Sequence, residues 1–233
     1  MNIFEHDFVL YGSQNTNFNK MARKEEFRLP LHKPSTIEVF LSLKSMPSYS
    51  KILFLNSGDK PYKGFLEWLL SNNFLENDYE RLTIKFIAEA YKTKASKITN
   101  WIKNIYEDIF ILNAERPDLF YTGGIKIYMN AKHYDNRCAF QMSLMVVPRE
   151  FETMVFYFFN AKVGTGRFWV KNINHEIEND IITVYLILDG GILNKYREFV
   201  LEKALFQGKI GLMTAMDVYP FEVERILNEL YRG

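Results

Sequence analysis

Cysteine is almost absent from this sequence: its 233 residues include only Cys138. A single cysteine excludes an internal disulfide and any zinc site built from several cysteines. This favours a reducing compartment, so we expect a cytoplasmic protein. Residues 1–14 lack the charged start and the long apolar run of a secretory signal peptide, which agrees with that expectation.

Long apolar runs and a strong excess of one charge are absent as well. No apolar run is long enough to span a bilayer, so we expect no membrane partner. The formal net charge of +1 argues against a protein that binds polyanions over its whole surface. Aromatic residues are abundant, with 20 Phe and 14 Tyr, which suits a β-rich core or an interface with a partner. The richness in Lys, Asn and Ile is typical of an AT-rich genome, such as that of a bacterium or a mobile element.

The stretch Ile84–Lys103 predicts two short helices joined by a tight turn. Apolar residues three or four positions apart share one face of each helix. These faces can pack against each other only if the helices cross closely, and the small side chain of Ala88 suits such a crossing. We expect Ser96 or a neighbour to cap the second helix. The two faces consist of Ile84, Ile87, Ala88 and Tyr91, and of Ile98, Trp101, Ile102, Ile105 and Ile109.

This stretch resembles the twenty-residue helix-turn-helix unit of bacterial DNA-binding proteins. The resemblance is confined to residues 84–103, and no whole-chain family is recognised. It departs at the turn, where Lys92 and Thr93 replace the usual glycine and apolar residue. The matching residues are Ile87 and Ala88 early in the unit, Tyr91 before the turn, and Ile98 and Trp101 in the second helix.

The resemblance implies a DNA reader in which lysines meet phosphates while Asn100 and Thr99 reach base edges. The local charge agrees with this: residues 81–103 carry six basic residues and one acidic residue, whereas the whole chain has a net charge of only +1. The alternative is that two amphipathic helices pack in a core and that their lysines are merely exposed to solvent. The predicted nucleic-acid-binding residues are Lys94, Ser96, Lys97, Thr99, Asn100 and Lys103.

After Tyr121 the apolar period changes from that of a helix to that of a strand. Five apolar segments with short breaks predict an antiparallel meander, because parallel βαβ units would need helical crossovers. Helices at 195–206, with Phe199, Val200 and Phe206 facing inward, and at 220–231 complete the chain. The predicted strands are 125–134, 137–147, 152–161, 167–177 and 180–188, and the earlier predicted helices are 33–44, 61–73 and 96–113, with 51–55 as a strand or a helix end.

No catalytic constellation stands out, so we expect no enzyme activity, no cofactor and no metal site. The segment Gly164–Arg167 has the glycines of a phosphate loop, but it leads into a predicted strand and is interpreted as a hairpin turn. His133, Asp135 and Cys138 are too few and scattered for a metal site without another ligand such as His175, and surface turn residues are the usual case. Cys138 itself is interpreted as an inert buried thiol. The carboxylates near predicted strand ends, interpreted as a solvated rim, are Glu176, Glu178, Asp180 and Asp189.

Together these patterns predict an α+β protein. An N-terminal arm (1–35) is followed by a helical, helix-turn-helix-like unit (36–120) and then by an antiparallel five-strand β meander with two C-terminal helices (121–233). The first functional hypothesis is a non-catalytic protein whose helical half binds DNA. Its β half would bind a protein partner or a second copy of the chain. The second is a structural or assembly subunit of a phage or another large complex. An enzyme that uses acids of the β half ranks last.

Overall fold

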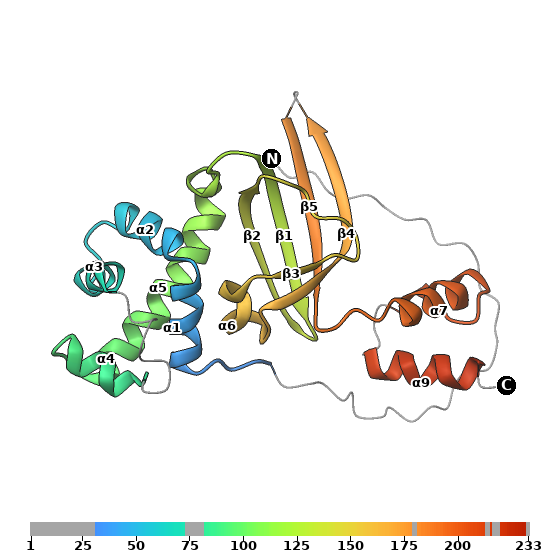
Figure 1. Ribbon diagram of the computed structural model, residues 1–233, viewed down its shortest axis with the longest axis horizontal. Coiled ribbons are helices and arrows are strands. Elements are labelled where there is room, and N and C mark those ends of the chain that lie inside the picture. Colours follow the sequence, from blue (N-terminus) through green and yellow to red (C-terminus); the bar gives the residue numbers. More distant parts are fainter. Residues whose placement is uncertain (1–30, 73–81, 179–180, 213–214, 216–219, 232–233) are drawn as a thin grey trace, which may run out of the picture. The chain divides into compact units, whose positions relative to one another are not determined.

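The computed structural model describes residues 31–72, 82–178, 181–212, 215 and 220–231 (Figure 1). The expected N-terminal arm therefore lies almost wholly outside the described residues. The described chain belongs to the predicted α+β class, with helices first, then a five-stranded sheet, then helices again. None of the described helices has both the length and the apolar character that crossing a lipid bilayer requires.

Three helices of the first half begin at a cap or a proline: α1 and α4 at a capping side chain, and α2 at Pro47. The Ser35 hydroxyl accepts a hydrogen bond from the Glu38 N–H at the start of α1, and Thr83 does the same for Phe86 at the start of α4. Residues 51–55 lie inside a helix, so the helical alternative is the correct one. The helices are α1 (Thr36–Ser45), α2 (Pro47–Asn56), α3 (Lys63–Ser71), α4 (Ile84–Ala90) and α5 (Ala95–Glu115), followed by the 3-10 turn η2 (Pro117–Phe120).

The sheet has the strand order β2-β1-β5-β4-β3. All neighbouring strands are antiparallel except β1 and β5, which pair in parallel. Five mostly antiparallel strands are thus confirmed, whereas the predicted meander is wrong, because β5 lies beside β1 in the middle of the sheet. The strands are β1 (Ile125–His133), β2 (Asn136–Leu144), β3 (Thr153–Val155), β4 (Arg167–Glu178) and β5 (Ile181–Gly190).

The largest departure from the prediction lies in its third strand, residues 152–161. After β3 the chain forms the 3-10 turn η3 (Tyr157–Phe159) and the short helix α6 (Asn160–Val163). Successive side chains of a strand point to opposite faces, so a strand cannot bury Phe158 and Phe159 in the same core, whereas a helical turn can. Both rings are fully buried. Gly164 then ends α6 with φ 82°, so this segment is a helix C-cap and not the predicted hairpin turn.

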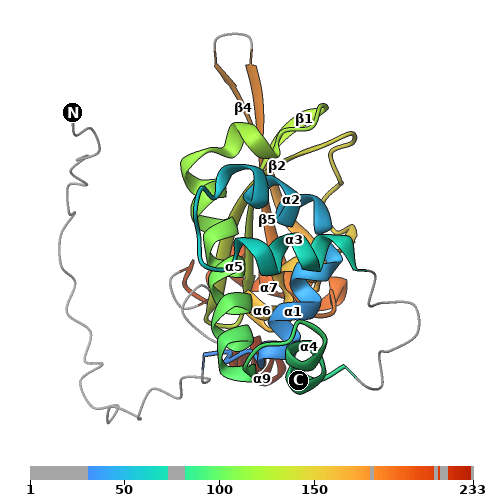
Figure 2. The same ribbon diagram turned by 90° about the vertical axis from the view of Figure 1, so that its left-hand side faces the viewer.

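Helix α5 joins the other helices to the sheet. Its buried stripe belongs to a hydrophobic core that also contains residues of α1 to α4 and of β1, β2, β4 and β5. Near the end of α5, the Asn113 side chain donates a hydrogen bond to the Gln141 carbonyl (2.7 Å) and accepts one from the Gln141 N–H (2.8 Å). Figure 2 shows the helices in front of the sheet, with α5 running along them. The stripe consists of Ile98, Ile102, Ile105 and Ile109.

The C-terminal helices α7 (Lys195–Phe206) and α9 (Pro220–Tyr231) have the predicted bounds. They bury a small cluster of their own around Ala204 and Leu227. The predicted inward orientation is wrong for Phe199 and Phe206, whose side chains are 61% and 93% exposed. The face of α7 that packs is the one with Ala204, so the two phenylalanines fall on the opposite side.

Trp101 is buried beside Ile98 and Ile105, as the helical period predicts, with 8% of its surface exposed. Replacing Trp101 with alanine should lower the free energy of unfolding by about 3–5 kcal/mol, because the site between three helices cannot collapse around the missing ring. Chemical denaturation measures the change. Ile111→Ala, which truncates an exposed side chain of the same helix, should change stability by no more than about 0.5 kcal/mol. Equal midpoints for wild type and Trp101→Ala would contradict this packing.

Candidate nucleic-acid interface

The α4–α5 turn is closed by its own backbone. The Thr93 N–H donates to the Ala88 carbonyl (2.9 Å) and the Lys92 N–H donates to the Glu89 carbonyl (3.1 Å). Lys92 has a φ of 55°, so a lysine takes the left-handed conformation in which helices usually place glycine. Ala88 is buried at the crossing of the two helices, as expected from its small side chain. The turn is therefore tight in spite of the missing glycine.

An aromatic cluster of Phe65, Trp68, Tyr91 and Trp101 holds this turn against α3. Phe65 stacks on Trp101 with ring centroids 5.7 Å apart, and its other aromatic neighbours are Tyr91 (5.3 Å) and Trp68 (5.7 Å). Gly64 leaves room for the cluster, since a Cβ there would lie only 3.2 Å from the Tyr91 hydroxyl. Aromatic pairs at these separations add to the free energy gained from burial. The start of α5 is thereby fixed relative to α3 and α4.

The predicted binding residues all lie at the start of α5 or in its first turns. Five of them are exposed, but Thr99 is half-buried. The predicted cap by Ser96 or a neighbour's side chain is wrong, because Lys94 occupies the N-cap position and makes no side-chain cap bond. The side chains of Lys94 and Lys103 form no ion pair or hydrogen bond with another described residue. The exposed five are Lys94, Ser96, Lys97, Asn100 and Lys103.

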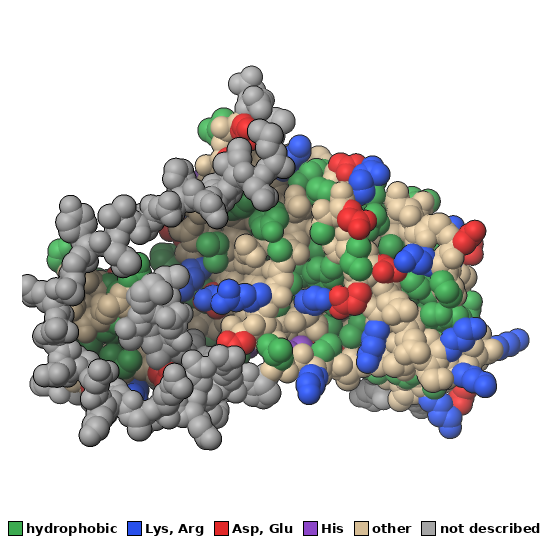
Figure 3. Space-filling view, turned by 180° about the vertical axis from the view of Figure 1, so that it is seen from behind, with side chains coloured by type: hydrophobic (Ala, Val, Ile, Leu, Met, Phe, Trp, Pro, Cys, Tyr) green, Lys and Arg blue, Asp and Glu red, His purple; other side chains and the backbone are tan. Residues whose placement is uncertain are grey.

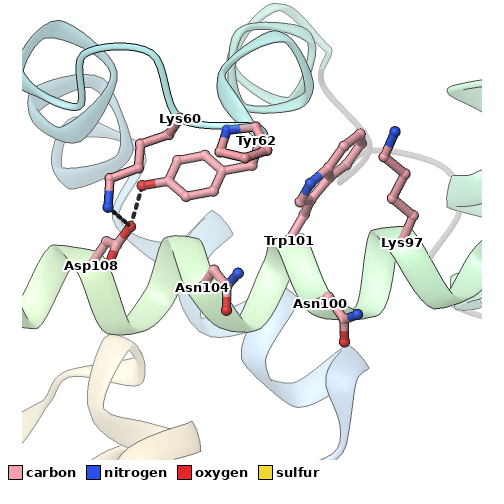
Figure 4. Close-up of a pocket in the computed structure, with 8 residues that line it drawn as sticks. Lys60, Tyr62, Lys97, Asn100, Trp101, Asn104 and Asp108 are labelled. Carbon is pink, nitrogen blue, oxygen red and sulfur yellow. Dashed lines mark hydrogen bonds and ion pairs between the residues drawn. The ribbon is translucent and has the colours of Figure 1, made fainter.

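Two of these residues, Lys97 and Asn100, line a cleft of about 370 Å³ between α5 and the loop that precedes α3 (Figure 4). The Lys97 ammonium lies 4.7 Å from the centroid of the Trp101 ring. Lys94, Ser96, Thr99 and Lys103 do not line this cleft. Its complete lining is Lys60, Pro61, Tyr62, Lys97, Asn100, Trp101, Asn104 and Asp108.

The far end of the cleft is organised by Asp108. The Tyr62 hydroxyl donates a hydrogen bond to this carboxylate, and the Lys60 ammonium lies 3.3 Å from the same oxygen. Burial raises the pKa of Tyr62, and the hydrogen bond to Asp108 raises it further. The cleft thus combines the ion pair of Lys60 and Asp108 at one end, the Lys97 cation at the other end and two amides between them. These groups can accept an anion and hydrogen-bond the edge of a planar polar group.

Sequence reasoning missed the cleft residues Lys60, Tyr62, Asn104 and Asp108. The spacing Asn100, Asn104, Asp108 carries a usable signal, because residues four apart share one face of a helix. Lys60 and Tyr62 carry no such signal. They come from a different loop, and only the tertiary fold brings them to α5.

The other residues considered for metal binding or catalysis do not come together in one site. Among the described residues, no three His, Cys, Asp or Glu side chains gather closely enough to hold a metal ion. Cys138 packs inside the core, where burial raises the pKa of its thiol to about 12 and makes the thiolate nucleophile scarce. Glu176 and Glu178 are exposed, Asp189 lies 3.8 Å from Lys132 and 3.7 Å from Lys171, and Asp180 lies outside the described residues.

No protein-family model, curated protein or solved structure matches this chain. The candidate interface therefore rests on its own residues and geometry. The resemblance of residues 84–103 to a helix-turn-helix unit stays a prediction.

Tyr62 gives this site a measurable pH dependence. Its pKa is raised above the ordinary value of 10.0, so its interactions stabilise the fold fully below about pH 10 and are lost as the pH rises toward the higher folded pKa. The stability cost of Tyr62→Phe should therefore be largest near neutral pH and shrink above about pH 10. Chemical denaturation of wild type and variant at about pH 8 and pH 11 measures it. If Tyr62→Phe lowered the free energy of unfolding equally at both pH values, burial and Asp108 would not raise the pKa of Tyr62.

Proposed function

We propose that this protein binds duplex DNA, without catalysis, through the outer face of the first half of α5. The observation that carries the proposal is the cation-rich, exposed start of this helix. Lys94, Lys97 and Lys103 are exposed there, and the positive end of the helix dipole lies at this end of the helix. The second half of α5 is fixed to the sheet through Asn113, so the first half is a rigid element to present to a partner.

The side chains of this face divide into two kinds. Lysines neutralise phosphates, which gives affinity and orientation for any sequence. The Asn100 amide can donate one hydrogen bond to an adenine edge and accept another from it. Asn104 lies one turn further along the same face. Thr99 is half-buried, and we expect it to contribute a contact with a thymine methyl group. Phosphate contact by lysines and base contact by Asn100 is therefore the division of labour that we propose.

This division can be tested with two variants. Lys97→Gln keeps part of the aliphatic stem but removes one phosphate contact, so affinity should fall for all duplexes and the slope of log K against log salt should shrink by about 0.9. Asn100→Ala should leave the slope unchanged and cost about 1–3 kcal/mol of discrimination at one base position. Titrations of labelled duplexes at three salt concentrations measure both effects.

Lys51→Gln is the matched control, because it removes one exposed positive charge on α2, outside the candidate interface. It should change neither the affinity nor the salt slope appreciably. If wild-type protein binds neither random nor genomic duplexes at low salt, or if Lys51→Gln weakens binding as much as Lys97→Gln, the proposal is wrong.

The second candidate function is that of an assembly subunit, and one observation favours it. Three large apolar side chains of α7, those of Tyr196, Phe199 and Phe206, are exposed on one side of the helix. Large apolar side chains that stay exposed on one side of a helix are typical of interaction sites. A second copy of the chain is the partner that suits it best, because a twofold interface uses the same patch from both subunits, and residues of both charge signs on α7 can pair across the axis.

The double variant Phe199→Asp with Phe206→Asp should convert an oligomer to a monomer, since it places charges in the centre of the patch. The molar mass in solution, measured at several protein concentrations, reports this change. Glu224→Ala, at an exposed position of α9, should keep the oligomer, because it leaves the apolar and charged side chains of α7 in place. A wild-type protein that is monomeric at every concentration would contradict the assembly hypothesis.

A further inference from the structure

The sheet has one face covered by helices and one face built from polar and aromatic side chains. Alternate residues of the central strands, such as Met129 and Leu186, are fully buried in the core, so their neighbours along each strand point the other way. Tyr128 on β1 and Tyr185 on β5 are such outward residues, and both are half-buried. We call this second side the open face, defined by the outward residues of β2, β1, β5 and β4.

Two tyrosine rings form the centre of the open face. Tyr128 and Tyr185 are direct partners in the parallel β1–β5 register, and their ring centroids lie 5.5 Å apart with planes inclined by 44°. They line a cleft of about 350 Å³ together with the exposed amides of Asn130 and Asn174. Ile187, 36% exposed, extends the apolar part of this surface. The cleft thus offers two neighbouring rings with hydrogen-bonding groups on both sides.

Basic residues outnumber acidic ones around these rings. The pairing register places Lys126 on one side of the tyrosine row and Lys132 and Arg137 on the other. Lys171 and Lys132 share a single carboxylate, that of Asp189, so their charges are only partly neutralised. Seen from behind, the molecule shows Lys and Arg side chains interspersed with Asp and Glu side chains among hydrophobic ones (Figure 3). Two acidic residues of β4 lie near this side: Glu176 lines the cleft, and Glu178 is exposed two residues further along the strand. The hydrogen bond between Glu176 and Tyr185 raises the pKa of the Tyr185 hydroxyl.

We propose that the open face binds a short single-stranded nucleic acid, with neighbouring bases stacked on Tyr128 and Tyr185. Sheets that bind single strands stack bases on aromatic rings of adjacent strands and hold the backbone with surrounding cations. The two rings, the flanking amides and the basic border supply these three elements. Duplex DNA does not suit this face, because its bases are already stacked and paired. The inference is independent of duplex binding by α5, since it uses different residues on a different element.

The test uses fluorescence-labelled ten-nucleotide probes, oligodeoxythymidine and oligouridine, titrated with the full-length protein at low salt. Tyr128→Ala and Tyr185→Ala should each weaken binding at least about fivefold, because each removes one stacking surface. Tyr185→Phe keeps the ring and should bind within about twofold of wild type, whereas loss of the hydroxyl would matter if the residue acted only by hydrogen bonding. Unfolding midpoints of all variants identify any that fail to fold. The two probes separate a DNA ligand from an RNA ligand.

Tyr157→Ala is the matched control, because it removes an exposed tyrosine ring on η3, outside the open face, and should leave oligonucleotide binding unchanged. Three results overturn the proposal: no binding of either probe by wild type, unchanged binding by both alanine variants, or equal loss with Tyr185→Phe and Tyr185→Ala. If the open face instead takes a protein segment, the titrations with both probes stay flat, which is the first of these results. A lack of oligonucleotide binding would not contradict duplex binding by α5. A lack of duplex binding by α5 would not contradict oligonucleotide binding at the open face.

Discussion

The burial of one stripe of α5 is the constraint on which the rest of the structure depends. Ile98, Ile102, Ile105 and Ile109 are fully buried, and they connect the small helices to the sheet through one hydrophobic core. Because these residues recur every three or four positions, the opposite side of the helix must face outward. The same packing therefore fixes both the core and the surface that we propose for DNA. Hydrogen bonds of Asn113 and of Tyr106, whose hydroxyl donates to the Phe158 carbonyl at 2.6 Å, prevent the helix from sliding along the sheet.

Much of the fold could be predicted because its signals are local. The helical period up to residue 115, the change of period after Tyr121 and the bounds of α7 and α9 all follow from patterns of neighbouring residues. The strand order could not be predicted, because the pairing of β1 with β5 joins residues far apart in the sequence. The helical turn at Phe158 and Phe159 was missed for a related reason. A run of aromatic residues favours a strand locally. The helical turn forms because both phenylalanine rings are buried in one core, which is a tertiary effect.

The candidate interface was predictable only in part. A local charge excess and helical periodicity led to Lys97 and Asn100, which the structure places in one cleft. The partners Lys60 and Tyr62 lie in another loop, so no spacing rule could find them. The aromatic cluster around Phe65 also depends on tertiary contacts, which no local pattern predicts. In the turn beside this cluster, Lys92 has a left-handed backbone conformation that lysine disfavours by itself. Packing of the surrounding rings offsets that local cost.

The proposed duplex binding by the rigid first half of α5 can be tested by mapping backbone and Asn side-chain amide resonances during titration with a duplex at low salt. We expect the largest chemical-shift changes within residues 94–104, including the side-chain amides of Asn100 and Asn104, while α2 and α7 change little. Shifts that leave residues 94–104 untouched at saturating duplex would show that α5 does not bind the duplex.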